Sequence, residues 1–170
     1  MRRSVLIFGT DHRYQRRDPF LSESQHEEFA SFLTRLARRH GVRLLAEEYS
    51  TQALAEQGIS ETTVERLAKG LGIAHCYCDL DRQTRFNLRI FQERHIRTEA
   101  LRKDWTEREI VERVAQSHRA RERFWLERLL EAQLWPVLFV CGADHARRFA
   151  SLLRAKRLDV SVIEEHWRAS

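Results

Sequence analysis

Short apolar runs separated by amphipathic segments constrain what this chain of 170 residues can fold into. The runs cover residues 4–8, 42–46, 73–78, 137–140 and 160–163. Each is too short for a helix and is rich in apolar or β-branched residues, as strands buried on both faces are. Strands that alternate with helices indicate an α/β fold with a mostly parallel sheet and helices on both faces. We therefore predict one α/β domain over residues 1–170, with about five strands.

Helix start and stop signals occupy the intervals between the runs. The candidate capping pairs are Ser24 with Glu27, Thr62 with Glu65, and Thr106 with Glu109. Gly41 is expected to end the first of these helices, and the third is expected to run to about residue 131. Another helix is predicted over residues 144–156. Residues 82–104 are predicted to be helical, although their hydrophobic periodicity is weak.

Charge, the lengths of the apolar runs and cysteine content argue against a nucleic-acid-binding, membrane or disulfide-rich protein. The net charge is +5, but basic and acidic residues alternate, as in Arg121-Glu122-Arg123, which is typical of solvated helix faces. We therefore do not expect a nucleic-acid partner. No apolar run reaches the roughly 18 residues of a membrane span, and no signal peptide is recognisable, so we expect a cytoplasmic protein without a membrane partner. Three cysteines do not suggest a disulfide framework.

Polar side chains follow four of the predicted strands. The sequences are Gly9-Thr10-Asp11-His12, Glu47-Glu48, Asp79-Leu80-Asp81 and Gly142-Ala143-Asp144-His145. The first and last are matching Gly-x-x-His turns, in which glycine lets the chain turn sharply off the strand. Ligands bind beyond the carboxyl ends of parallel strands, so we expect these groups to converge there.

Two imidazoles and nearby carboxylates suit a divalent transition metal such as Mn, Co or Zn, whose identity the sequence does not determine. We predict His12 and His145 as metal ligands, together with Glu47 and Asp79. In the alternative interpretation, the histidines only cap a turn or begin a helix, and Asp79 only forms a turn. Strand alternation directs only one of Glu47 and Glu48 toward the site, and the sequence does not say which.

Two polar residues fall within the apolar face of the predicted long helix. At about 100° per residue, that face is formed by Ile110, Val114, Trp125 and Leu129. His118 and Arg121 lie inside it, where an unpaired charge is costly. Either these residues form a buried salt bridge or reach water, or the helix passes the site. In the second case both are candidate catalytic residues, and Arg121 would hold a carboxylate or an anionic intermediate.

Taken in order, these motifs resemble the superfamily of TraB and Tiki proteins, erythromycin esterase and the ChaN haem-binding proteins. That family pairs two Gly-x-x-His motifs with one or two glutamates. It also carries an Arg-acid-x-x-aromatic-or-Met segment before the second histidine, which residues 121–126 match here. Residues 149–153 and 158–163 are similar to the family's last helix and strand. The chain is shorter than most members and has no recognisable anchor or export signal.

The resemblance implies a hydrolase, since several members are metal-dependent peptidases or lactone hydrolases. It also implies that His12, His145 and one of the two glutamates are metal or catalytic groups, with Arg121 in support. The metal would lower the pKa of a bound water from about 15.7 towards about 7. The second glutamate would take the proton of that water, and Arg121 or the metal would stabilise the oxyanion. The substrate would be a small molecule or peptide with an ester, lactone or amide bond.

The alternative hypothesis is a non-catalytic binding or regulatory module that uses the same pocket. The turns after the first and fourth strands open towards helix N-termini, which favour anions. A small nucleotide- or phosphate-like ligand would then be held by backbone amides and by arginines such as Arg13, Arg16 and Arg147. The sequence contains no Gly-rich phosphate loop of a standard type.

Overall fold

A five-stranded parallel sheet forms the centre of the protein, in a computed structural model that describes residues 3–170. The strands are β1 (Ser4–Thr10), β2 (Leu44–Glu47), β3 (Ala74–Tyr77), β4 (Val137–Gly142) and β5 (Asp159–Trp167). Their order is β3-β2-β4-β1-β5, and every neighbouring pair is parallel. The predicted α/β fold is therefore confirmed, with all of the strands parallel rather than most of them.

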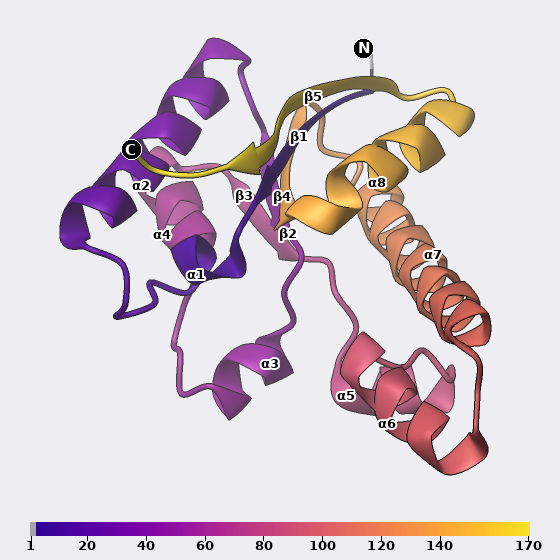
Figure 1. Cartoon of the computed structure of the whole chain (residues 1–170). Helices are drawn as coiled ribbons and strands as arrows, with labels where there is room; N and C mark the ends of the chain where they lie inside the picture. The colour runs from indigo at the N-terminus through magenta and orange to yellow at the C-terminus, as the bar shows by residue number, and fades with distance from the viewer. Residues whose placement is uncertain (1–2) are drawn as a thin grey trace.

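Helices cover both faces of the sheet (Figure 1). Within residues 3–170 they are α1 (His12–Gln15), α2 (Glu23–Arg39), α3 (Thr51–Glu56), α4 (Thr63–Leu71), α5 (Arg82–Asn87), α6 (Glu93–Lys103), α7 (Glu107–Ala132) and α8 (Ala143–Ala155). The sequence did not predict α1 and α3, because helices of 4 and 6 residues are too short to show periodicity. No helix in this part of the chain combines the length and the apolar character needed to cross a membrane.

Successive residues of the central strands face two different hydrophobic cores. On β1, Val5 and Ile7 pack in the core that α7 and α8 cover. Leu6 and Phe8 pack in the opposite core, beneath α2 and α4. A strand covered on both faces needs an apolar side chain at every position, because successive side chains point in opposite directions. This explains why residues 4–8 form an unbroken apolar run.

The start of α2 differs from the prediction. Its N-cap is Ser22, whose hydroxyl accepts from the Gln25 N–H, while the Gln25 side chain accepts from the Ser22 N–H. The predicted pair of Ser24 and Glu27 is therefore wrong, and both residues lie inside the helix. Two overlapping pairs with the same spacing are present in the sequence, and the structure uses the earlier one.

Other helix boundaries follow their sequence signals. Thr62 and Thr106 cap α4 and α7 as predicted. Gly41 follows the end of α2 with a φ of 57°, a left-handed conformation that favours glycine. Residues 82–104 form two helices rather than one, and Arg89 adopts a φ of 56° in the connection. The break between α5 and α6 explains the weak periodicity of this segment.

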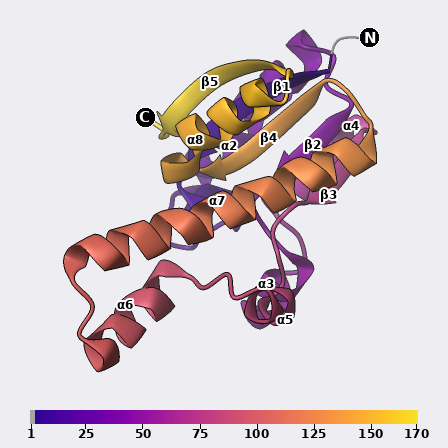
Figure 2. The same ribbon diagram turned by 90° about the vertical axis from the view of Figure 1, so that its right-hand side faces the viewer.

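The carboxyl ends of the strands lie on the same side as α3, α5 and α6 (Figure 1). Figure 2 shows α7 crossing one face of the sheet and continuing past its edge, with α6 beside its N-terminal half. Ile96 and Ala100 of α6 pack there against Ile110 of α7 in a small separate apolar cluster. These helices therefore border the strand ends.

Candidate active site

The two Gly-x-x-His turns leave the sheet side by side, because β1 and β4 are neighbours. Thr10 lies opposite Gly142 in the parallel ladder. His12 begins α1, and His145 lies in the first turn of α8. Both histidines line a cavity of about 450 Å³ at the carboxyl edge of the sheet. The structure therefore brings together the two histidines that the sequence proposes.

The two glycines of these turns have different roles. A Cβ on Gly142 would lie 2.9 Å from His12 Nε2 and 3.4 Å from Glu48 Oε2. Only glycine therefore lets the imidazole approach the start of α8 so closely. A Cβ on Gly9 would instead collide with the backbone carbonyl of Glu165 in β5. Gly9 thus permits the close pairing of two strands, whereas Gly142 shapes the cavity.

Glu48 lies between the two histidines. Its Oε2 is 3.7 Å from His12 Nε2, and its Oε1 is 3.5 Å from His145 Nε2. The Gly142 N–H donates to Oε2 at 2.8 Å, and Arg121 Nη2 donates to Oε1 at 2.6 Å. Burial would raise the pKa of Glu48, but the charge of Arg121 lowers it below its usual value. Glu48 is therefore the glutamate that faces the cavity, and it is ionised at neutral pH.

Glu47 points away from this cavity, as alternation along a strand requires. Its fully buried carboxyl group accepts from Gln15 Nε2 at 2.8 Å and from the Thr62 hydroxyl. Nε2 of His75 lies 2.9 Å from the same group. Glu47, which was predicted to be a metal ligand, is therefore enclosed by three partners from other elements.

Gln15 joins Glu47 to His12. The amide nitrogen of Gln15 donates to Glu47, so its amide oxygen is the atom that lies 2.8 Å from His12 Nδ1. Since an amide oxygen only accepts, Nδ1 carries a proton, and in the neutral imidazole the free lone pair is therefore on Nε2. Sequence reasoning missed Gln15, whose only signal is a polar residue three positions after the histidine of a Gly-x-x-His turn.

His145 is oriented in a similar way by Glu122. Nδ1 of His145 lies 2.7 Å from Glu122 Oε1, and Trp125 packs against the imidazole with 4.9 Å between ring centroids. A carboxylate only accepts, so Nδ1 donates and Nε2 is directed at Glu48 and Arg121. Interpreting residues 121–123 as a solvated face was wrong for two of the three, because Glu122 is 2% exposed and the Arg121 side chain 12% exposed.

Arg121 connects Glu48 to Asp79. Its Nη2 donates to Asp79 Oδ2 at 2.8 Å, and its Nε donates to Oδ1 at 3.2 Å. Trp125 Nε1 also donates to Oδ1 at 3.0 Å, and Arg85 forms an ion pair with Oδ2. Burial would raise the pKa of Asp79, but the charges of Arg121 and Arg85 lower it. Asp79 is therefore a buried partner behind Arg121 and does not line the cavity.

His118 lines the same cavity from α7. Its ring centroid is 4.6 Å from that of His145, and its Nδ1 lies 2.6 Å from Arg148 Nη2. Burial, followed by the charges of His145, Arg148 and Arg121, lowers the pKa of His118 to about 4. The imidazole is therefore neutral at pH 7 and accepts a hydrogen bond from Arg148. His118 therefore forms part of the cavity wall beside His145.

A divalent metal at this edge stays a prediction of the sequence. Nδ1 of His12 is held by Gln15 and Nδ1 of His145 by Glu122, so both Nε2 atoms face Glu48. Histidines that bind a metal are commonly held at the other ring nitrogen in the same way. However, both oxygens of Glu48 already accept hydrogen bonds, and Arg121 places a cation 3.5 Å from His145 Nε2. In residues 3–170, no group of three or more His, Cys, Asp or Glu side chains is arranged to hold a metal ion. The positive charge beside Glu48 is that of Arg121.

The arginines predicted to hold an anionic ligand in this pocket are already paired with carboxylates. The pairs are Arg13 with Asp11, Arg16 with Asp18, and Arg147 with Glu165. None of these three arginines is among the described residues that line the cavity. These three arginines therefore do not contribute to the cavity, and the binding module stays a prediction.

Comparisons of the chain with protein-family models, curated proteins and solved structures found no match. The resemblance to the TraB, Tiki, erythromycin esterase and ChaN superfamily therefore stays a prediction from short motifs. The site itself combines an imidazole held at Nδ1 by Gln15, an ionised carboxylate and a buried guanidinium around one cavity. General acid–base and electrostatic catalysis use groups of these kinds.

Proposed function

We propose that this chain is a hydrolase in which His12 activates water beside Glu48. The observation that carries this proposal is the hydrogen bond between Gln15 and His12, which places the proton of the neutral imidazole on Nδ1 and directs Nε2 to the cavity side. The His12 side chain is 39% exposed, so water and a substrate can reach it. Imidazole is the commonest general base in enzymes, and it acts through a nitrogen with a free lone pair.

Glu48 and Arg121 supply the charges that this reaction needs. When His12 takes a proton from water, it becomes an imidazolium, which the ionised Glu48 at 3.7 Å stabilises. Attack of the water on a carbonyl group then places negative charge on the carbonyl oxygen. Arg121 lines the cavity, as does the start of α8, which carries no side-chain cap. Both favour an anion at that position, and the substrates that fit are esters, lactones and amides.

The divalent metal predicted from the sequence, Mn, Co or Zn, is a separate part of this proposal. His12, His145 and Glu48 are the residues that would hold it. A bound metal would supply a water of lowered pKa. Since Arg121 now bonds to Glu48, metal binding would require these two side chains to separate. We therefore expect a bound metal and the Arg121–Glu48 ion pair to be mutually exclusive.

The test uses protein without a histidine tag, assayed with p-nitrophenyl esters and a panel of lactones. We expect His12→Ala to lower kcat/KM by about 10²-fold or more, the usual contribution of a general base. His40→Ala is the matched control, since His40 is exposed and lies at the end of α2, away from the cavity. Equal rates in the two variants would contradict the proposal.

The same preparations decide the part played by metal. Inductively coupled plasma mass spectrometry measures metal in the wild type, in His12→Ala and in His145→Ala. A stoichiometric metal lost in both variants, together with activity abolished by a chelator, would support metal-assisted hydrolysis. Activity that survives chelation in metal-free protein would assign water activation to His12 alone.

A further inference from the structure

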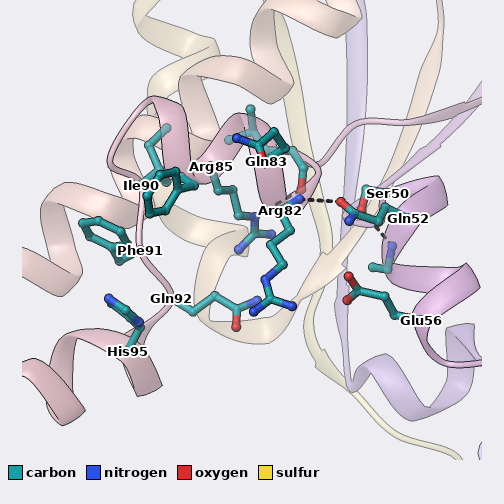
Figure 3. Close-up of a pocket in the computed structure, with 13 residues that line it drawn as sticks. Ser50, Gln52, Glu56, Arg82, Gln83, Arg85, Ile90, Phe91, Gln92 and His95 are labelled. Atoms are coloured by element: carbon teal, nitrogen blue, oxygen red, sulfur yellow. Dashed lines mark hydrogen bonds between the residues drawn. The ribbon is translucent and has the colours of Figure 1, made fainter.

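A second, larger cavity lies beyond the ends of β2 and β3, between α3, α5 and α6 (Figure 3). Its volume is about 730 Å³, which is within the range of small-molecule sites. None of its lining residues lines the cavity of His12. The proposed hydrolysis therefore leaves this cavity without a role.

Two arginines of α5 project into this cavity from one wall (Figure 3). Arg85 donates through Nε to the Leu80 carbonyl and pairs through Nη2 with Asp79. Its Nη1 is buried and has no hydrogen-bond partner in the described part of the chain. Arg82 is exposed, and no carboxylate among residues 3–170 pairs with it. An unpaired buried donor is costly, so Arg85 can still gain a hydrogen bond, while the exposed Arg82 is directly accessible to an anion.

Another wall comes from the start of α6 and the two residues before it. His95 and Gln92 provide groups that form hydrogen bonds, and Phe91 stacks on His95 with 4.7 Å between ring centroids. Glu56 is the one carboxylate among the described lining residues. The cavity therefore combines excess positive charge with an aromatic surface. That combination suits a ligand with an anionic head and an apolar body.

We propose that this cavity binds a small organic anion, in which a phosphate or carboxylate group carries an aromatic or aliphatic part. Arg82 and Arg85 hold the charged oxygens, and Phe91 contacts the apolar part. The planar guanidinium of Arg82 matches either head group because it can donate two parallel hydrogen bonds, whereas Arg85 has only Nη1 left to donate. This inference does not depend on water activation at His12. Arg85 nevertheless connects the two sites, since Asp79 also binds Arg121.

The test is a titration followed by NMR, using phenyl phosphate and benzoate as anionic probes. Benzyl alcohol serves as the neutral probe, and inorganic phosphate as the probe without an apolar part. We expect at least one of the two anionic probes to saturate, with amide shifts at Gln83 and Gln92 rather than at residues 142–145. Arg82→Gln should weaken binding about tenfold, the loss expected for one charge-assisted hydrogen bond. Arg94→Gln, an exposed arginine of α6 outside this cavity, should leave binding unchanged.

Stronger binding of phenyl phosphate than of benzoate would identify phosphate as the preferred head group, and the reverse order would identify carboxylate. Saturation by neither anionic probe would overturn the proposal. Equal weakening by Arg82→Gln and Arg94→Gln would also overturn it, as would benzyl alcohol binding as tightly as the anions. Shifts confined to residues 142–145 would place the anion at the first cavity and overturn it too. The readout is binding, so an inactive protein gives the same test.

Discussion

The side-chain oxygen of Gln15 accepts a hydrogen bond from Nδ1 of His12 at 2.8 Å. We expect Gln15→Met to lower kcat about tenfold or more, because a partner of this kind fixes the ring and its tautomer. The fully buried Glu47 also loses one donor, so stability should fall by about 1–3 kcal/mol. Steady-state kinetics and denaturant unfolding measure the two effects. Gln57→Met, at an exposed position, is the control, and an equal loss of kcat there would argue against the His12–Gln15 relay.

Substitutions at Gly142 and Gly70 distinguish a defect in the site from a defect in the fold. An added Cβ would lie 2.9 Å from His12 Nε2, so Gly142→Ala must displace the imidazole. We expect activity to fall about 10²-fold, as misplacing a catalytic group by about 1 Å does. Gly70→Ala in α4 meets nothing within 4 Å and should be stabilising by about 0.4–1 kcal/mol with unchanged activity. Full activity in Gly142→Ala would show that His12 does not need this position.

The buried carboxylates predict acid sensitivity. Glu48 and Asp79 have folded-state pKa values below their usual 4.5 and 3.8, so the unfolded state takes up protons first as the pH falls. Their contribution to stability is therefore complete at neutral pH, and it is lost below about pH 4.5 as the pH falls through the folded pKa values. Denaturant unfolding between pH 7 and pH 3 measures it. Asp79→Asn should be less stable at pH 7 but should lose less stability over this interval than the wild type. Exposed Glu127→Gln should follow the wild type, and a wild-type stability independent of pH would contradict the assignment.

One of the three free cysteines should react before the others. A hydrogen bond from the Cys78 thiol and the charge of Arg128, acting against burial, lower the pKa of Cys76 to about 6. Hydrogen bonding to Cys76 and burial raise the pKa of Cys78, and burial raises that of Cys141. Iodoacetamide at pH 7 should therefore modify Cys76 first, at a rate that levels off above about pH 7. Peptide mass spectrometry locates the label, and Cys76→Ser should remove the fast phase. Equal labelling of all three cysteines would contradict the prediction.

Patterns that repeat over a few residues were sufficient for most of the fold. The apolar run at residues 4–8 predicted β1 because burial on both faces requires apolar side chains without interruption. Thr62 and Thr106 marked helix starts because an N-cap acts on an N–H three residues away. In residues 22–27 two such signals overlap, and the prediction took Ser24 as the N-cap where the structure has Ser22.

The sequence by itself determined that two Gly-x-x-His turns and several acids would end parallel strands at one edge of a sheet. Only the tertiary structure decided which acid faces the cavity, what holds each imidazole, and where Arg121 finds its partners. Those contacts join distant residues, since Gly142 and Glu48 are 94 positions apart and Glu122 and His145 are 23 apart. A pattern that spans a few residues cannot predict contacts between residues so far apart in the chain. They form only because burial leaves polar groups without water, and each must then find a partner among the residues that the fold places beside it.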